Sequence, residues 1–146
     1  MLLLYFLVLI KFILIKNPSF FFHRMESGIS KHAVAGNLRS ANFTPFKTIH
    51  DYLSGALGVT IAVENIGGNF LGFIPLGILL PLLFISLRNG FKIILCIFFI
   101  SLGFETFQLL TDTGQFDVDD LILNTTGGYA GFLIYYFFKP HLKHNL

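Results

Sequence analysis

The sequence predicts an all-α, polytopic membrane protein with four transmembrane helices and a long outward loop between the first two. Of its 146 residues, 54% are hydrophobic and 12% are charged, whereas soluble domains carry roughly 25% charged residues. Phe alone occurs 19 times. A soluble protein of this size and composition would expose large apolar patches. The length is sufficient for one domain, spanning residues 1–146.

Long apolar segments define the predicted spans. The first is short for the roughly 20 residues that a span needs, and it contains Lys11. It lacks the basic start and the small-residue cleavage site of a secretory signal, so we expect a retained helix. The second contains Pro75 and Pro81, which membrane helices tolerate because neighbouring groups satisfy the freed carbonyls. The four predicted spans are approximately residues 2–16, 67–87, 91–111 and 121–138.

Two short sequence features predict how these segments are arranged. The turn Arg88-Asn89-Gly90 is short enough to place the second and third spans antiparallel. Gly127 and Gly131 form a G-x-x-x-G pair, which is typical of close helix contacts in membranes.

The connection at residues 17–64 is polar and contains a predicted turn and a short helix. Pro45 biases Thr44 away from helix, which indicates a turn within Asn42-Phe43-Thr44-Pro45-Phe46. Thr48 can cap a helix running towards Gly55. Four apolar side chains of this segment are spaced to lie in a membrane interface: Phe46, Ile49, Tyr52 and Leu53.

Charge predicts the orientation. Four spans would place both termini and the Arg88 turn on one side, which carries Arg88, Lys92, Lys139 and Lys143. Cytoplasmic loops are enriched in Lys and Arg, so both termini are predicted to be cytoplasmic in a multi-pass protein of the cell membrane. The acidic loop between the third and fourth spans then faces outward.

Polar side chains converge at the predicted outward end of the spans. Glu105 and Gln108 are three apart and share a helix face. Asp117, Asp120 and Asn124 share a face if the fourth helix begins near Asp117. A carboxylate facing lipid costs several kcal/mol, so Glu105 should face the bundle or a wet cavity. Topology brings five side chains to a similar depth and predicts a polar pocket: Asn65, Asn69, Glu105, Gln108 and Asn124.

Each of these residues has a structural alternative. Glu105 is either a ligand contact or proton acceptor, or a hydrogen-bonding partner across the bundle, and Gln108 could equally serve packing. The three asparagines could cap helix ends. Asp117, Asp119 and Asp120 could cap the fourth helix and complement its dipole, or bind Mg²⁺ or Ca²⁺. The motif D-x-D-D has no second acidic partner motif, so no metal or other cofactor is assigned.

Outside the predicted pocket, Arg39 is either a solvated surface residue or a ligand contact. It lies just before the Asn42 turn and could reach an anionic headgroup. The five histidines show no ligand spacing, and Cys96 is an apolar packing residue. No catalytic residues are assigned, because no nucleophile motif occurs. A net charge of +2 without a basic aromatic patch argues against nucleic acid.

Four motifs carry a resemblance to a known family. They are N-F-T-P-F-K-T-I from Asn42, N-I-G-G-N-F-L-G-F-I-P-L-G from Asn65, E-T-F-Q from Glu105 and F-D-V-D-D-L-I-L-N-T-T-G-G from Phe116. In order and spacing the chain resembles the VanZ family, small membrane proteins associated with teicoplanin resistance. One departure is Gln115 after Gly114, where the family usually has Arg. If that Arg pairs with an acid or an anionic ligand in relatives, this chain lacks the partner.

The resemblance implies protection against glycopeptides of the teicoplanin type, with little or none against vancomycin. Our physical hypothesis is that a pocket lined by Asn65, Asn69, Glu105, Gln108, Asp120 and Asn124 engages a lipid-linked molecule at the outer leaflet. That molecule would be the antibiotic with its acyl chain, or a cell-wall precursor lipid.

Two other classes of function stay open from the sequence. In an intramembrane enzyme acting on a lipid-linked precursor, Glu105 would be the acid or base and Asp117 or Asp120 a metal or water ligand. A small transporter would need a polar path, and the inner half of the spans is almost free of polar groups. The sequence does not give the oligomeric state.

Overall fold

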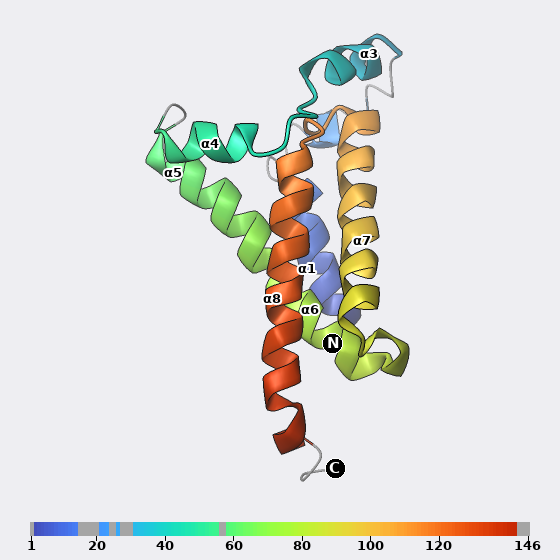
Figure 1. Ribbon diagram of the computed structural model, residues 1–146. Coiled ribbons are helices and arrows are strands. Elements are labelled where there is room, and N and C mark those ends of the chain that lie inside the picture. The colour runs from blue at the N-terminus through green and yellow to red at the C-terminus, as the bar shows by residue number, and fades with distance from the viewer. Residues whose placement is uncertain (1, 15–20, 24–25, 27–30, 56–57, 143–146) are drawn as a thin grey trace.

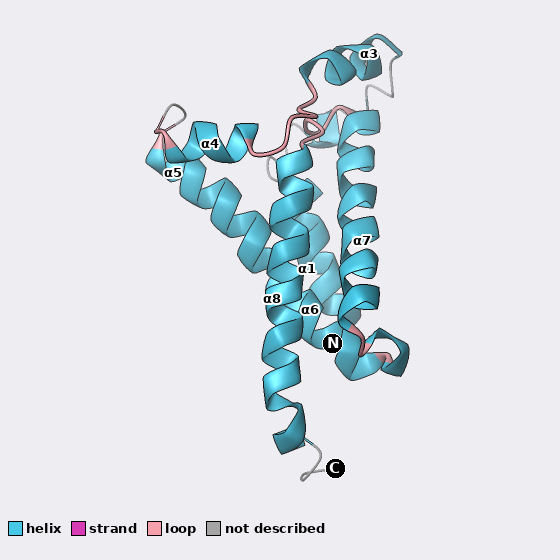
Figure 2. Ribbon diagram, in the orientation of Figure 1, coloured by secondary structure: helices cyan, strands magenta, loops and turns pink. Residues whose placement is uncertain are grey.

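The computed structural model describes residues 2–14, 21–23, 26, 31–55 and 58–142. In these residues the regular structure is helical, and the one β-type pairing is an isolated parallel bridge between Asn42 and Asp117 (Figure 2). The prediction of an all-α protein is therefore confirmed for the described part of the chain.

Helices make up most of the described chain. The first is α1 (Leu2–Leu14), followed by the two short helices α3 (Lys31–Ser40) and α4 (Lys47–Leu53). Next comes one continuous helical rod, which consists of α5 (Val59–Ala62), a π-helical turn η1 (Val63–Gly67) and α6 (Gly68–Leu83). The chain ends with a 3₁₀ turn η2 (Ile85–Leu87) and two long helices, α7 (Gly90–Thr111) and α8 (Val118–Leu142).

The long helices form a bundle with the short helices at one end (Figure 1). The α3 and α4 helices lie at the end where α7 finishes and α8 begins. The rod from α5 to α6 slants from the α4 end across the bundle, so it crosses α8 rather than running parallel to it. The beginning of α1 and the end of α8 lie towards the opposite end.

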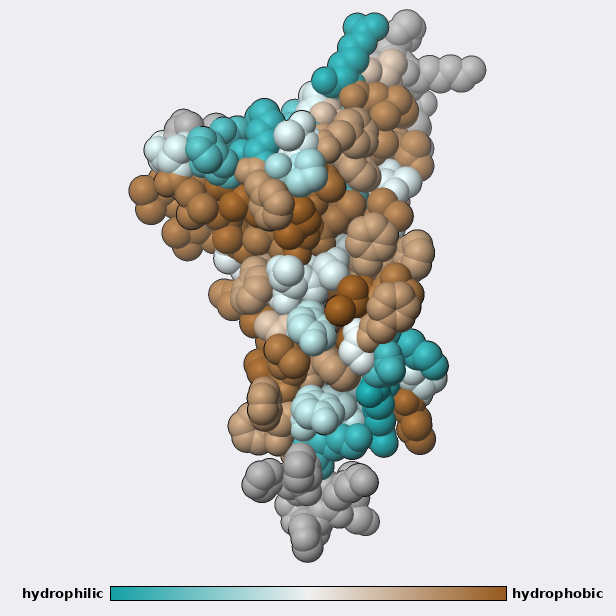
Figure 3. Space-filling model, in the orientation of Figure 1, coloured by the Kyte–Doolittle hydropathy of each residue, from teal (hydrophilic) through white to brown (hydrophobic). Residues whose placement is uncertain are grey.

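Among the described residues, two helical segments are long and apolar enough to cross a membrane: Val59–Leu83 and Gly90–Thr111. In each, only 33% of the most apolar window is buried, so most of these apolar side chains face outward, unlike those of a core helix in a soluble domain. Apolar side chains cover the middle of the visible face, and hydrophilic ones gather towards its two ends (Figure 3). The four-span topology stays a prediction.

The second long helix begins earlier than the predicted second span. It starts at Val59, after Gly58 with φ 84°, and it ends at Leu83, because Phe84 is extended with φ −119° and ψ 107°. The Arg88 side chain closes this end by donating from Nε to the Pro81 carbonyl at 3.1 Å. The earlier start puts Asn65 and Asn69 inside the helix instead of at its entry.

A glycine seam (Gly77, Gly127 and Gly131) joins α6 to α8. A Cβ added at Gly127 or Gly131 would overlap the backbone carbonyl of Phe70 or Ile74, respectively. A Cβ at Gly77 would overlap the carbonyl of Gly128 in the same way. The two backbones are therefore in direct contact, as the G-x-x-x-G pair predicts.

The hydrophobic core lies where α1, α6, α7 and α8 meet. Phe73 and Leu76 of α6 and Ile93 and Ile97 of α7 are fully buried. The α1 helix adds Leu9 and Ile13 to this cluster. A hydrogen bond from the Tyr5 hydroxyl to the Gly72 carbonyl also holds α1 against α6.

Candidate functional site

The buried carboxylate of Asp119, at the start of α8, caps the N-terminus of α4. It accepts hydrogen bonds from the backbone N–H groups of Phe46, of Thr48 at 2.7 Å and of Ile49 at 3.1 Å. The first N–H groups of a helix have no partner within the helix, and a negative charge there is favourable. These donors explain how a fully buried carboxylate is accommodated, since Asp119 is 0% exposed.

Thr48 therefore does not cap α4 as the sequence suggested. The N-cap position belongs to Phe46, which has φ 64° and offers no side-chain cap. The Thr48 hydroxyl instead donates to Asp117 Oδ2 at 2.6 Å and accepts from Asn42 Nδ2 at 3.0 Å. The local pattern was misleading because the capping group comes from a distant helix.

Hydrogen bonds of Asn42 and Asp117 connect the loop before α4 to the loop before α8. The Asn42 N–H donates to the Phe116 carbonyl at 2.9 Å, and the Val118 N–H donates to the Asn42 carbonyl at 3.0 Å. Asp117 Oδ1 accepts from Asn42 Nδ2 at 2.9 Å and from the Asp119 N–H at 2.9 Å. Both carboxylate oxygens of Asp117 are thus engaged within the protein, and one of them caps α8.

Glu105 links this network to α7. Its side chain is 1% exposed, and its Oε2 accepts the Asp117 N–H at 3.0 Å. The predicted inward orientation of Glu105 is therefore observed. The Glu105 carboxylate thus binds the backbone N–H of Asp117, just before α8. The Asp117 carboxylate in turn binds Asn42, Thr48 and the Asp119 N–H.

Asn69 and Asp120 connect α6 to α8. Asn69 is 4% exposed and donates from Nδ2 to Asp120 Oδ1. Asn65 instead donates to the Ile61 carbonyl, four residues earlier in its own helix, at 2.8 Å. Both asparagines lie within the helical rod, so the helix-cap alternative is wrong for them.

Asn124 and Gln108 make the remaining contacts of the predicted site. Asn124 is 1% exposed and donates from Nδ2 to Ser101 Oγ at 2.8 Å, while its Oδ1 is buried without a hydrogen-bond partner among the described residues. It too lies inside its helix and is not a cap. Gln108 donates from Nε2 to the Ile13 carbonyl at 3.0 Å and so holds the end of α1. The sequence pattern did not single out Ser101, although it lies four residues before Glu105 on the same face.

The structure thus gathers most of the predicted site into one polar layer across α6, α7 and α8. We define the polar layer as Asn69, Ser101, Glu105, Gln108, Asp117, Asp119, Asp120 and Asn124. Arg39 is apart from it, exposed in the last turn of α3. Among the described residues no group of three or more His, Cys, Asp or Glu side chains is arranged to hold a metal ion.

Comparison with known proteins now identifies the family. The family model described as VanZ/LLP1 matches residues 2–139. The chain belongs to the VanZ/LLP1 family. Protein VanZ of Enterococcus faecium is 31% identical over 107 residues, which is 72% of this chain and 58% of that protein. The chain therefore matches somewhat more than half the length of this curated relative. No solved structure matches the chain.

The four sequence motifs contact one another in the structure. The stretch from Asn42 to Ile49 and the stretch from Phe116 to Asp119 bind each other through capping and bridging hydrogen bonds. The motif from Asn65 supplies Asn69 to Asp120, and the motif from Glu105 supplies the acceptor for the Asp117 N–H. Gln115, which the sequence analysis singled out, is exposed in the loop before α8.

The surface of α4 carries an exposed ion pair beside this network. Lys47 Nζ lies 3.0 Å from Asp51 Oδ2, and this hydrogen bond lowers the pKa of Asp51 and raises that of Lys47. Exposed pairs of this kind stabilise proteins little. Burial raises the pKa of Tyr52, and the negative charges of Asp120 and Asp117 raise it further.

Proposed function

We propose that this VanZ/LLP1 protein is a multi-pass protein of the cytoplasmic membrane that confers low-level tolerance of teicoplanin-type lipoglycopeptides. Its termini lie in the cytoplasm, and the polar layer lies towards the outer leaflet. There the protein engages a lipid-linked ligand, which is the antibiotic's acyl portion with its adjoining polar groups or a cell-wall precursor lipid. Family membership supports this general function, and the position of the polar layer supports the ligand.

The observation that carries the proposal is the buried carboxylate of Glu105 within the polar layer of a largely apolar helical bundle. Ionisable groups at membrane depth are costly and usually functional. Glu105 and Asp120 lie at the end of the bundle where α7 finishes, and Arg88 and Lys92 lie at the other end of α7. The positive-inside rule counts Lys and Arg in short loops, so the short turn with Arg88 and Lys92 supports a cytoplasmic location of that end. Arg39 and Lys47 lie at the outward end, in the long connection before the second long helix.

A membrane protein can discriminate between teicoplanin and vancomycin because only one of them inserts a hydrocarbon chain into the bilayer. Teicoplanin carries an acyl chain and vancomycin does not, so a protein within the membrane can contact the first at the depth where its chain inserts. The intramembrane enzyme is the rival class, with Glu105 as acid or base. Two measurements distinguish an enzyme from a binding protein. An enzyme would change the mass of the extracted precursor lipids, and a metal-dependent one would lose its activity when a chelator is added.

The proposal is tested by antibiotic susceptibility in a Gram-positive host that lacks its own copy. Empty vector, wild type, Glu105→Gln and the control Asp51→Asn are compared at matched membrane levels with teicoplanin and vancomycin. Gln keeps an oxygen that can accept the Asp117 N–H, so this variant removes the charge with little change in shape. Wild type and Asp51→Asn should raise tolerance to teicoplanin alone, and Glu105→Gln should not. A wild-type chain that leaves both susceptibilities unchanged would refute the function.

A further inference from the structure

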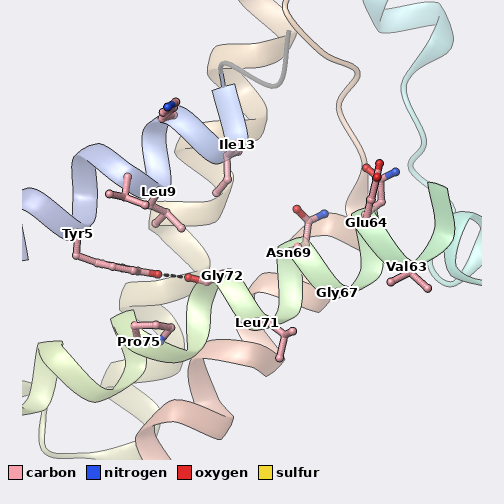
Figure 4. A pocket seen from close by; sticks show the side chains of 14 residues that line it. Tyr5, Leu9, Ile13, Val63, Glu64, Gly67, Asn69, Leu71, Gly72 and Pro75 are labelled. Carbon is pink, nitrogen blue, oxygen red and sulfur yellow. Dashed lines mark hydrogen bonds between the residues drawn. The ribbon is translucent and has the colours of Figure 1, made fainter. Parts of the chain in front are cut away.

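A groove separates α1 from the rod formed by α5, η1 and α6. Its volume is about 940 Å³, which is near the upper end of the roughly 300–1,000 Å³ of small-molecule sites. Figure 4 shows α1 on one side and the rod on the other, with Leu9 and Asn69 lining the space between them. Glu105 and Asn124 do not line it, so it is a separate feature from most of the polar layer.

The lining of the groove changes from polar to apolar along its length. The polar members come from the end of α1 and from the part of the rod around η1: Lys11, Glu64, Asn65 and Asn69. The other end is lined by Tyr5, Leu71, Gly72 and Pro75, and the Tyr5 hydroxyl is satisfied there by the Gly72 carbonyl. One end therefore suits hydrogen-bonding groups and the other suits hydrocarbon.

The helical wall of the groove is shaped by two glycines and a π-helical turn. A Cβ added at Gly67 or Gly68 would meet no heavy atom within 4 Å, so these positions leave open space beside the rod. At Gly72 the Leu9 side chain is 3.8 Å from such a Cβ, an ordinary van der Waals distance, so α1 approaches the rod there. The π-turn Val63–Gly67 lies at the polar end, and single π-turns within helices are frequent at functional sites.

We propose that this groove holds one hydrocarbon chain of a membrane amphiphile, with the polar head of that molecule at the Asn65 and Asn69 end. The inference rests on the membrane location and lipid-linked ligand proposed above, and it names the part of the protein that takes the chain. The wall Val59–Leu83 is long and apolar enough to cross a membrane, so the medium around the groove would be lipid hydrocarbon.

The chemistry of the polar end defines the head that it accepts. An asparagine amide carries two N–H donors and an oxygen acceptor, so Asn69, which donates one N–H to Asp120, can still bind a polar head. Lys11 and Glu64 give the lining of the groove one charge of each sign, so the lining does not select a head of a single sign. A head carrying both donors and acceptors, such as a hydroxylated or amide-containing one, matches this set.

The test is photo-crosslinking of the full-length protein in vesicles. The vesicles consist of phosphatidylglycerol with a small fraction of phosphatidylglycerol that carries a diazirine on one acyl chain. After illumination, the labelled peptides are located by mass spectrometry. Labelling of the wild type should concentrate on the groove residues Val8 and Leu71 above the level on the exposed Phe99 of α7 and Phe137 of α8.

Gly68→Leu supplies the decisive variant and Gly103→Leu its matched control. Both glycines lie in long helices with no heavy atom within 4 Å of an added Cβ, but only Gly68 lines the groove. In Gly68→Leu the excess labelling of Val8 and Leu71 should be lost, whereas Gly103→Leu should retain it. Uniform labelling of groove and outer faces, or excess labelling that survives Gly68→Leu, would overturn the inference.

A helix from a second copy is the competing occupant of the groove. In that case groove labelling would be low at high protein density and would rise on dilution with lipid, which would also overturn the proposal. The labelling experiment uses no antibiotic, and the susceptibility experiment uses no probe. Failure of the groove and failure of the proposed function are therefore separate outcomes.

Discussion

The buried carboxylate of Asp119 on α8 accepts a hydrogen bond from the backbone N–H of Thr48 on α4 at 2.7 Å, across 71 positions of sequence. Together with the bonds from Phe46 and Ile49, this contact fixes a seven-residue helix against the start of α8. A helix this short is marginal alone, so its position depends on the carboxylate of a distant helix.

Replacing Asp119 by Ala should therefore release α4. Buried donors left without a partner cost about 1–3 kcal/mol each, so the unfolding midpoint in detergent should fall clearly. Protease cleavage in the α4 segment should also become faster. Asp51→Ala, which removes only an exposed ion pair, should change stability by less than about 1 kcal/mol. Equal protease resistance of wild type and Asp119→Ala would contradict the capping role.

A methyl group at Gly131 should force α6 away from α8. Its Cβ would overlap the Ile74 backbone carbonyl, which cannot rotate aside. Overpacking costs about 1–3 kcal/mol, so Gly131→Ala should lower the thermal midpoint of the purified protein. Gly103→Ala is the control, because open space surrounds that position and Ala favours helix by about 0.5–1 kcal/mol. Similar midpoints for the two variants would argue against backbone contact.

The Asn124–Ser101 pair should behave as one unit between α8 and α7. A double-mutant cycle with Asn124→Leu and Ser101→Ala should give a coupling energy of about 0.6 kcal/mol, typical of hydrogen bonds between membrane helices. The measurement is reversible unfolding in mixed micelles. Strictly additive effects would show that the 2.8 Å contact stabilises nothing.

The predicted orientation of the second span can be tested by labelling cysteines at the two ends of the helix Val59–Leu83. In a Cys96→Ser background, Ser54→Cys and Ser86→Cys place one exposed thiol on either side of Val59–Leu83. A membrane-impermeant maleimide added to intact cells should label Ser54→Cys and not Ser86→Cys. Labelling of Ser86→Cys alone would reverse the orientation, and labelling of both would exclude a membrane between them.

Some helix limits follow from local chemistry and others do not. The sequence predicted a third span at 91–111, and the helix α7 runs from Gly90 to Thr111 because Asn89 caps it, accepting the N–H groups of Phe91 and Lys92. The Val59 start could not be predicted, since the apolar run there is interrupted by Glu64 and Asn65, which the π-turn accommodates. The α3 helix was not expected, because its segment is polar and has no apolar stripe.

In the candidate site, too, some features follow from the local sequence and others depend on distant segments. Helical spacing correctly predicted that Glu105 and Gln108 turn inward together, and both are buried. Spacing did not predict the partners, because the Asp117 N–H and the Ile13 carbonyl come from other elements. The role of Asp119 was likewise hidden, since its neighbours suggested a cap for its own helix. Contacts between distant segments decided these cases.

The glycine seam limits how the sequence can drift during evolution. At Gly77, Gly127 and Gly131 the obstacle to a side chain is backbone, which no second substitution can make smaller. A substitution at any of these glycines therefore requires the two helices to move apart. Gly128 differs because the nearest atoms belong to the Ile97 side chain, so a smaller residue at Ile97 would make room for alanine there. Gly128 and Ile97 are therefore expected to change together more readily than the three seam positions.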